Sequence, residues 1–315
     1  MSIIDKILSR NEFTTDPPIL IDIGASESLP KEWAIIAKYS ICIAFDADKR
    51  EMGYIVNEKS RFRKLYTFNC IVSDKRRRKT NFYLTSSPYC SSLLEPDSKR
   101  VINLDFYNLF HVKKKIKLNS ITLPTVLKEL KIKNIDWFKT DSQGTDLRLF
   151  KSLGDFIINK VLVADFEPGI TDVYKSEDKL YNLLAYMDNS PFFVCGMKTG
   201  GSIRINEAII SSRFNDLERK ILNLVSKKSP CWVGISYLNT FENIKIFGKR
   251  DFLLEWVFSL IKNQLCFALE LAIRGKEKFN DPIFPELEQY SLKKIKNRIN
   301  FFPLYFFKQI CPLHR

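Results

Sequence analysis

One stretch constrains the fold more than any other: residues 19–26 have the sequence ILIDIGAS. Its aliphatic residues predict a short buried strand, and the glycine at position 24 permits a tight turn directly after it. A strand that ends in Asp-x-Gly places one carboxylate and backbone N–H groups at the carboxyl edge of a sheet, where open α/β proteins bind ligands. The same residues also form ordinary strand-to-helix turns, so the stretch alone leaves both interpretations open.

A second apolar stretch, residues 41–45, ends in Asp46-Ala47-Asp48. Between the two strands, Pro30 can start a helix over residues 31–39, and the order strand, helix, strand implies a right-handed parallel crossover. Asp46 follows Gly24 by about 20 residues, the spacing at which a carboxylate binds the hydroxyls of a ribose. Asp22, Gly24 and Asp46 together therefore indicate a ligand that contains adenosine.

Apolar runs and helical periodicity predict an α/β domain that is followed by helices. We expect strands at residues 19–23, 41–45, 65–72, 81–84, 135–140, 161–166, 192–195 and 203–210. We expect helices at residues 2–9, 31–39, 49–59, 122–130, 146–153, 178–187, 217–225, 252–274 and 286–299. The pattern changes near residue 215, which predicts a domain over residues 1–215 and a helical C-terminal extension over residues 216–315.

The charge of the chain favours anionic partners. Its 315 residues contain 50 Lys and Arg against 36 Asp and Glu, which gives a net charge of +14. Nucleic acid, anionic lipid and acidic sugars all fit such a surface, and a lysine-rich proteome explains it equally well. A basic run at residues 75–79 is most simply a solvated hairpin tip, and the alternative is an anion-binding patch.

The seven cysteines are scattered, odd in number and without a Cys-x-x-Cys pair. This pattern argues against a zinc site or a disulfide scaffold, so we expect no metal and a cytoplasmic protein with reduced thiols. His111 and His314 are the two histidines, so acid–base chemistry rests on carboxylates, Lys or Tyr. The first 13 residues lack a signal-peptide core, and no apolar run approaches the ~18 residues of a membrane span.

Several motifs follow one another in a recognisable order. They are Asp22-Ile23-Gly24-Ala25, Phe45-Asp46-Ala47-Asp48, the segment CSSLLEP at residues 90–96, Thr122-Leu123, the segment IDWFKTDSQG at residues 135–144, and Glu167. In this order they resemble the FkbM family of S-adenosylmethionine-dependent methyltransferases. The resemblance covers residues 17–212 and is most specific at the Lys-x-Asp-x-x-Gly segment. It implies the Rossmann-like class I methyltransferase fold, with a seven-stranded, mainly parallel sheet whose final strand is antiparallel.

The resemblance also implies roles for individual residues. Residues expected to bind S-adenosyl-L-methionine are Asp22, Gly24, Ala25 and Ser26 at its methionine end, Asp46 at its ribose, and Ser73 and Asp74 near its adenine. Asp141 and Glu167 are expected to face the reacting centre from the ends of two neighbouring strands. A hydroxyl acceptor must lose a proton, and a carboxylate within hydrogen-bond reach can take it. Asp141 is the first candidate for this base and Glu167 the second.

The chain departs from the family pattern at two places. Gln143 stands where the family usually has Glu, and Glu27-Ser28 stands where it often has a further glycine. If the missing carboxylate is catalytic in the family, the protein is slow, altered in substrate or inactive. If that carboxylate only hydrogen-bonds backbone, Gln143 can replace it. Asp141 also has a simpler interpretation, as the N-cap of the helix that follows.

The leading functional hypothesis is O-methylation of a glycan or a related polar cell-surface acceptor. RNA methylation is a second hypothesis, which the positive charge motivates, although residues 75–79 lack interleaved aromatic residues that could stack on bases. A third hypothesis is a cofactor-binding protein without catalysis, which Gln143 and Ser28 motivate.

The C-terminal end has basic residues at 293–298 and clustered aromatic residues at 299–308. This pattern fits peripheral contact with an anionic membrane, here its inner face, where rings lie near the headgroups and lysines near the phosphates. The alternative is that the rings fold back over the helical region. The segment is too short to span a bilayer.

Overall fold

The computed structural model describes residues 2–25, 30–48, 50 and 61–301. The chain forms two compact units, one over Phe13–Glu242 and one that joins Met1–Glu12 to the region from Asn243 onward. The predicted site residue Ser26, the predicted helix at 49–59 apart from residue 50, and the aromatic tail from residue 302 lie outside the described residues.

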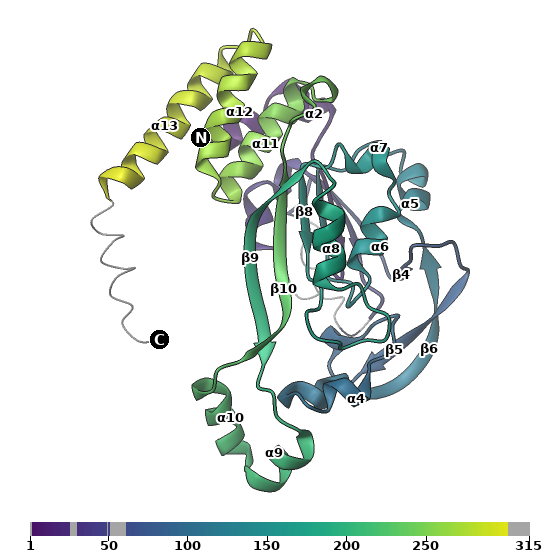
Figure 1. The fold of residues 1–315 in the computed structure, drawn as a ribbon. Helices are drawn as coiled ribbons and strands as arrows, with labels where there is room; N and C mark the ends of the chain where they lie inside the picture. The colour runs from purple at the N-terminus through teal and green to yellow at the C-terminus, as the bar shows by residue number, and fades with distance from the viewer. Residues whose placement is uncertain (1, 26–29, 49, 51–60, 302–315) are drawn as a thin grey trace. The chain divides into compact units, whose positions relative to one another are not determined.

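The larger unit is built on a seven-stranded sheet with the strand order β3-β2-β1-β7-β8-β10-β9 (Figure 1). Its strands are β1 (Ile19–Ile23), β2 (Ile41–Phe45), β3 (Lys64–Phe68), β7 (Trp137–Thr140), β8 (Val163–Phe166), β9 (Phe192–Ser202) and β10 (Ser229–Asn239). Every pairing is parallel except the two made by β10, which is antiparallel to both β8 and β9. The predicted α/β architecture with a seven-stranded, mainly parallel sheet is therefore confirmed.

The central strands are short and apolar because both faces of the sheet are covered. All five residues of β1 are buried. On one face, a single core cluster joins β1, β2, β7 and β8 to the helices α5 (Leu123–Glu129), α6 (Asp146–Lys151), α7 (Asp155–Ile158) and α8 (Leu180–Met187). Phe138 and Phe150 lie at the centre of this cluster, with ring centroids 5.1 Å apart.

The crossover between β1 and β2 differs from its prediction. Two short 3-10 helices, η1 (Lys31–Ile35) and η2 (Ala37–Tyr39), replace the expected single helix over 31–39. The residues that suggested helical periodicity are nevertheless inside, since Trp33 and Ile36 are fully buried and the Trp33 ring meets Trp137 edge-on at 5.8 Å. The apolar pattern thus predicted which side chains of this segment are buried, but not that the segment forms 3-10 helices.

A small second sheet has the order β4-β6-β5, with β4 (Ile71–Val72), β5 (Lys79–Thr85) and β6 (Val112–Ile121). The strand predicted over 65–72 is divided between the two sheets, because the chain leaves the large sheet after Phe68. Strand β6 was not predicted. Between β5 and β6 lie η4 (Pro88–Cys90), α4 (Ser98–Val101) and η5 (Asp105–Phe110).

The strand predicted over 203–210 is wrong. That region contains α9 (Glu207–Arg213), which with α10 (Asp216–Val225) connects β9 to β10 (Figure 1). Strand β10 was not predicted, and it completes the large sheet from beyond residue 215. The predicted domain boundary therefore falls between α9 and α10, inside the larger unit.

The smaller unit is helical and contains α1 (Ile3–Leu8), η6 (Ile244–Ile246), α11 (Lys249–Ile261), α12 (Leu265–Lys278) and α13 (Ile283–Asn300), while α2 (Asn11–Thr15) spans its junction with the larger unit. The single helix predicted over 252–274 is two helices, because the chain turns at Asn263, whose φ is 63°. Among the described residues, no helix is both long and apolar enough to cross a membrane.

Candidate functional site

Four parallel strands end side by side at the carboxyl edge of the large sheet. The register pairs Ile23 of β1 with Phe45 of β2 and with Thr140 of β7, and Thr140 with Phe166 of β8. The residues that follow these strand ends therefore meet at one edge. Strand β1 lies between β2 and β7, so the chain order reverses here, and such switch points are where open α/β sheets bind ligands.

Gly24 brings two of these strand ends into close contact. Its φ is 79°, and a Cβ atom added to it would lie 2.3 Å from the carbonyl oxygen of Asp141. The N–H groups of Gly24 and Ala25 both donate to the carbonyl of Phe45, each at 3.0 Å. A residue with a side chain would separate the ends of β1 and β7, so the glycine is required by the packing as well as by the turn.

Asp22 forms a buried ion pair across the two central strands. Its Oδ1 atom lies 2.6 Å from Nζ of Lys139, and the Asp22 side chain is 2% exposed. Burial alone would lower the pKa of Lys139, but the charge and hydrogen bond of Asp22 outweigh it and raise that pKa. Asp22 and Ala25 do not line either cavity described below, so the structure places these two predicted residues beneath the site.

The first cavity lies beside Gly24 and is open to solvent, with about 440 Å³ of space between its walls and the solvent at its mouth. Gly24, Asp46 and Asp141 line it, and its apolar wall includes Ile71, Val72 and Phe82. One oxygen of Asp46 accepts a hydrogen bond from the backbone N–H of Asp48 at 2.7 Å. Apolar walls with a few polar groups are typical of small-molecule sites.

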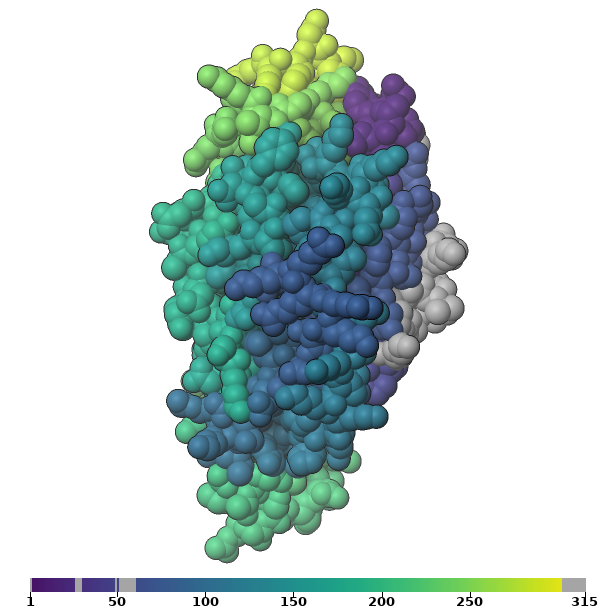
Figure 2. Space-filling view, turned by 90° about the vertical axis from the view of Figure 1, so that its right-hand side faces the viewer, coloured from purple at the N-terminus to yellow at the C-terminus, as the bar shows by residue number. Residues whose placement is uncertain are grey.

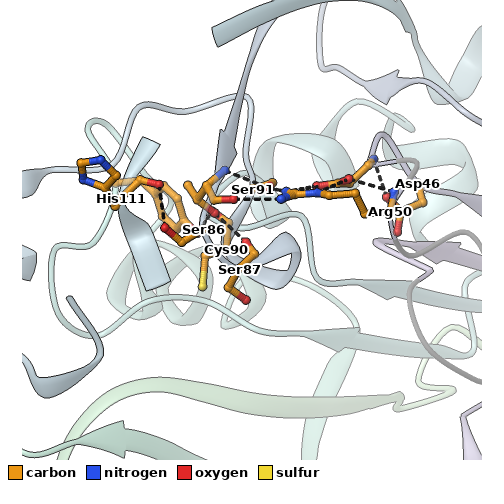
Figure 3. A network of polar contacts seen from close by, with 10 residues as sticks. Asp46, Arg50, Ser86, Ser87, Cys90, Ser91 and His111 are labelled. Carbon is orange, nitrogen blue, oxygen red and sulfur yellow. Dashed lines mark hydrogen bonds and ion pairs between the residues drawn. The ribbon is translucent and has the colours of Figure 1, made fainter. Parts of the chain in front are cut away.

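A polar network joins the end of β2 to the loop after β5 (Figure 3). Arg50 pairs with Asp48 at 2.5 Å and donates to Ser91 Oγ and to the carbonyl of Thr85, both at 3.0 Å. Burial alone would raise the pKa of Asp48, but its hydrogen bonds with Arg50 outweigh it and lower that pKa. The network supports the part of the first cavity wall that contains Asp46, and no sequence pattern indicated the contacts of Arg50.

A second cavity of about 820 Å³ opens on the other side of Asp141. Aromatic and acidic residues make up much of its wall; they are Tyr89, Phe106, Phe110, Tyr174, Trp232, Asp141, Glu167 and Glu177. No Lys, Arg or His is among the described residues that line it. Asp141 thus belongs to the walls of both cavities, while Glu167 belongs to the second.

The surroundings of the two predicted catalytic carboxylates disfavour their ionised forms. Burial raises the pKa of Asp141 well above its ordinary value, and the charges of Glu167 and Asp146 raise it further against the opposing charge of Lys139. Burial and the charge of Asp146 also raise the pKa of Glu167. The charge of Lys139 and a hydrogen bond from the indole of Trp232 act in the opposite direction but do not outweigh this rise. Each carboxylate is therefore a stronger base than an exposed one.

Gln143 holds Asp141 in place from a left-handed backbone conformation, with a φ of 56°. Its Nε2 atom donates to Asp141 Oδ1 at 2.6 Å, and its Oε1 atom accepts from the hydroxyl of Tyr174 at 2.8 Å. Its backbone carbonyl accepts from Ser92 Oγ at 2.8 Å. The amide can donate to a carboxylate, which an ionised glutamate at this position could not do.

Asp146 organises the loop that carries Asp141. Its Oδ1 atom accepts from the hydroxyl of Thr140 at 2.9 Å and from Ser142, through the backbone N–H at 2.9 Å and the hydroxyl at 2.6 Å. Its Oδ2 atom accepts from the N–H of Glu167 at 3.3 Å. Sequence reasoning missed this role. Helix α6 has Thr145 at its N-cap, so Asp141 is not the cap of that helix.

Ser73 and Asp74, which were predicted near adenine, line a third space of about 970 Å³. Ser73 Oγ lies 2.7 Å from the hydroxyl of Ser120. Thr145 lines this space and also the first cavity, so the two adjoin. The structure therefore places the predicted adenine residues next to the first cavity rather than in its wall.

Comparison of the chain with protein-family models, with curated proteins and with solved structures found no match. Among the described residues, no group of three or more His, Cys, Asp or Glu could hold a metal ion. The geometry of the two joined cavities is therefore the basis for assigning a function.

Proposed function

We propose that this chain is an S-adenosylmethionine-dependent methyltransferase that O-methylates a glycan or a related polar acceptor. One observation carries the proposal: Asp141 separates a cavity lined by Gly24 and Asp46 from a cavity lined by Glu167 and aromatic rings. The sheet supports it, because the last strand in sequence, β10, is antiparallel in an otherwise parallel seven-stranded sheet. This is the arrangement that the resemblance to the FkbM family implies.

The first cavity has the groups that the cofactor needs. Asp46 would accept the ribose hydroxyls, and Ile71, Val72 and Phe82 would cover the adenine. Gly24 lets the backbone approach the methionine end without a side chain in the way. When bound, the cofactor supplies a methyl group on a positively charged sulfonium.

In the second cavity, Asp141 would accept the proton of the acceptor hydroxyl. Its raised pKa makes it a better base, and Gln143 fixes its orientation. Holding the hydroxyl beside the methyl group supplies a large part of the acceleration, since proximity replaces a bimolecular encounter. Glu167 lines the same cavity and would accept a second hydroxyl of the acceptor.

The wall of the second cavity favours a sugar ring as the acceptor. Aromatic rings pack against the C–H face of a sugar, while carboxylates accept hydrogen bonds from its hydroxyls. The described lining residues include three carboxylates and no cation, so a phosphate group would be repelled there. This observation favours a glycan over an RNA backbone at the reacting position.

Isothermal titration calorimetry and transfer of an isotopic methyl group test the proposal. Asp46→Ala should weaken cofactor binding by about 1.5–3 kcal/mol, the range for a hydrogen bond to a charged group. Asp141→Asn should keep cofactor affinity and lose most of the methyl transfer into the glycan fraction of an extract. Glu129→Gln, an exposed control on α5, should change neither. If the wild-type protein binds no cofactor, or Asp46→Ala binds it equally well, the assignment is wrong.

A further inference from the structure

One part of the surface concentrates the positive charge of the chain. Strands β5 and β6 and the segment before β5 contain nine Lys and Arg, namely residues 75–79, Lys113, Lys114, Lys115 and Lys117. Residues 75–85 and 112–121 contain no Asp or Glu. We call these nine residues the basic sheet surface. Figure 2 shows long side chains in the blue part of the colour scale, from the region before and within β5, across the centre of one face.

The nine side chains are exposed, and within the described part of the chain none of them forms an ion pair. The register places Lys115 opposite Tyr83 and Lys117 opposite Asn81, so Lys79, Lys115 and Lys117 share one face of the hairpin. Alternate residues of a strand lie about 7 Å apart. Like charges at this spacing repel one another, and an anionic partner would relieve that repulsion.

The basic sheet surface reaches the candidate site. The opposite face of β5 presents Phe82 to the first cavity. Lys75, Arg77 and Thr145 line the third space, and Thr145 also lines the first cavity. Leu94 lines the third space as well, and it lies 3.1 Å from the position of a Cβ atom on Gly144, which lines the second cavity. The cations therefore lie at a recess that neighbours both cavities. A flat membrane could not enter this recess, whereas a chain molecule could.

We propose that the basic sheet surface binds the anionic part of the acceptor, an acidic polysaccharide whose uncharged sugar enters the second cavity. The proposal rests on the proposed glycan methylation. The opposite charges of the two sites support it, since an acidic chain is attracted by the sheet and repelled by the carboxylates.

Strand β5 has two aromatic residues and β6 has none. Phe82 lines the first cavity, and Lys115 Nζ lies 5.0 Å from the centroid of the Tyr83 ring. Tyr83 is therefore the single ring that these two strands place on the face of Lys115 and Lys117, which disfavours nucleic acid as the partner because successive bases bind by stacking on several aromatic side chains.

Fluorescence anisotropy with labelled polygalacturonate tests this binding on the full-length protein. The double variant Lys115→Glu/Lys117→Glu changes two exposed strand positions and should weaken binding by about tenfold or more at low salt. The control Lys227→Glu/Lys228→Glu changes two exposed lysines of the same unit and the net charge by the same amount, and should have less than about a twofold effect. Neutral dextran should not bind to either protein.

Three outcomes would overturn the proposal. Wild type does not bind polygalacturonate, or the two double variants lose the same amount of affinity for it. The third is tighter binding of a single-stranded RNA, or of phosphatidylglycerol vesicles, than of polygalacturonate at the same ionic strength. Calorimetry with the cofactor separates this proposal from the proposed function. If Lys115→Glu/Lys117→Glu keeps cofactor affinity, the variant is folded, and its loss of polygalacturonate affinity results from the change at the basic sheet surface. If wild type binds polygalacturonate but no cofactor, the methyltransferase assignment fails and the docking surface remains.

Discussion

Substitution of Gly24 by alanine tests how the site is assembled. Two glycines of the larger unit have nearly the same positive φ, 79° at Gly24 and 78° at Gly154. A Cβ atom on Gly24 would lie 2.3 Å from the carbonyl oxygen of Asp141, whereas a Cβ atom on Gly154 meets nothing within 4 Å. Gly154→Ala is therefore a matched control that carries the conformational cost without the steric contact.

The expected size of the effect follows from these two contributions. A side chain at so positive a φ costs about 1–3 kcal/mol. At Gly24 the Asp141 carbonyl must also withdraw by about 0.7 Å, from 2.3 Å to the 3.0 Å below which Cβ contacts essentially never occur. That movement strains the hydrogen bond from the Asp141 N–H to the Ile23 carbonyl, which is 2.9 Å long. Such overpacking adds about 1–3 kcal/mol, so Gly24→Ala should cost about 2–6 kcal/mol in all.

Urea unfolding followed by tryptophan fluorescence measures the difference, because Trp33 and Trp137 are fully buried beside the same strands. Gly24→Ala should be less stable than Gly154→Ala by about 1–3 kcal/mol. It should also lose cofactor binding, since the carbonyl that moves belongs to Asp141. Equal stability of the two variants, or normal cofactor binding by Gly24→Ala, would show that the close contact does not shape the site.

Three further predictions concern buried and paired groups. Lys139→Met should cost about 3–5 kcal/mol in urea unfolding, because it leaves the buried Asp22 carboxylate without its cation, and the double variant with Asp22→Asn should recover part of the loss. Tyr174→Phe should cost about 1–2 kcal/mol and lower methyl transfer more than cofactor affinity, because its hydroxyl no longer donates to the amide that orients the base. In the smaller unit, burial alone would raise the pKa of Glu12, but Lys249 and Arg10 outweigh it and lower that pKa from 4.5 to about 2. The stability that this carboxylate contributes is present above pH 4.5 and is lost as the pH falls toward 2. The melting temperature of the full chain should therefore depend less on pH between these values in Glu12→Gln than in wild type. An unchanged acid dependence in Glu12→Gln would contradict the assignment.

The central strands could be predicted because their signal is local. Strands β1, β2, β7 and β8 are buried on both faces, so each is a short, mainly apolar run. Strand β6 could not be predicted, because four exposed lysines interrupt its apolar residues and its pairing with β5 and β4 holds it in place. Strand β10 buries Cys231, Val233 and Ile235 in alternation, but Pro230 and Gly234 obscure that pattern in the sequence.

In the candidate site, too, some features could be predicted from the sequence and others could not. Gly24, Asp46, Asp141 and Glu167 each follow an apolar strand, so their positions at one sheet edge follow from the order of the strands. The supporting contacts could not be predicted, because they join distant parts of the chain. Tyr174, for example, reaches across 31 residues to Gln143 and across 84 residues to the carbonyl of Cys90.

Four carboxylates lie close to the candidate site: Asp22 on β1, Asp141 after β7, Asp146 at the start of α6 and Glu167 after β8. They differ in the groups that stabilise their negative charge. Asp22 is matched by Lys139, and Asp146 accepts hydrogen bonds from Thr140 and Ser142. Asp141 and Glu167 face the second cavity, where burial and like charges raise the pKa of both. Neighbouring carboxylates with raised pKa values in a cleft are typical of functional sites. The unfavourable charge belongs to residues that line the second cavity, which is where, in the proposed function, the acceptor hydroxyl would lose its proton.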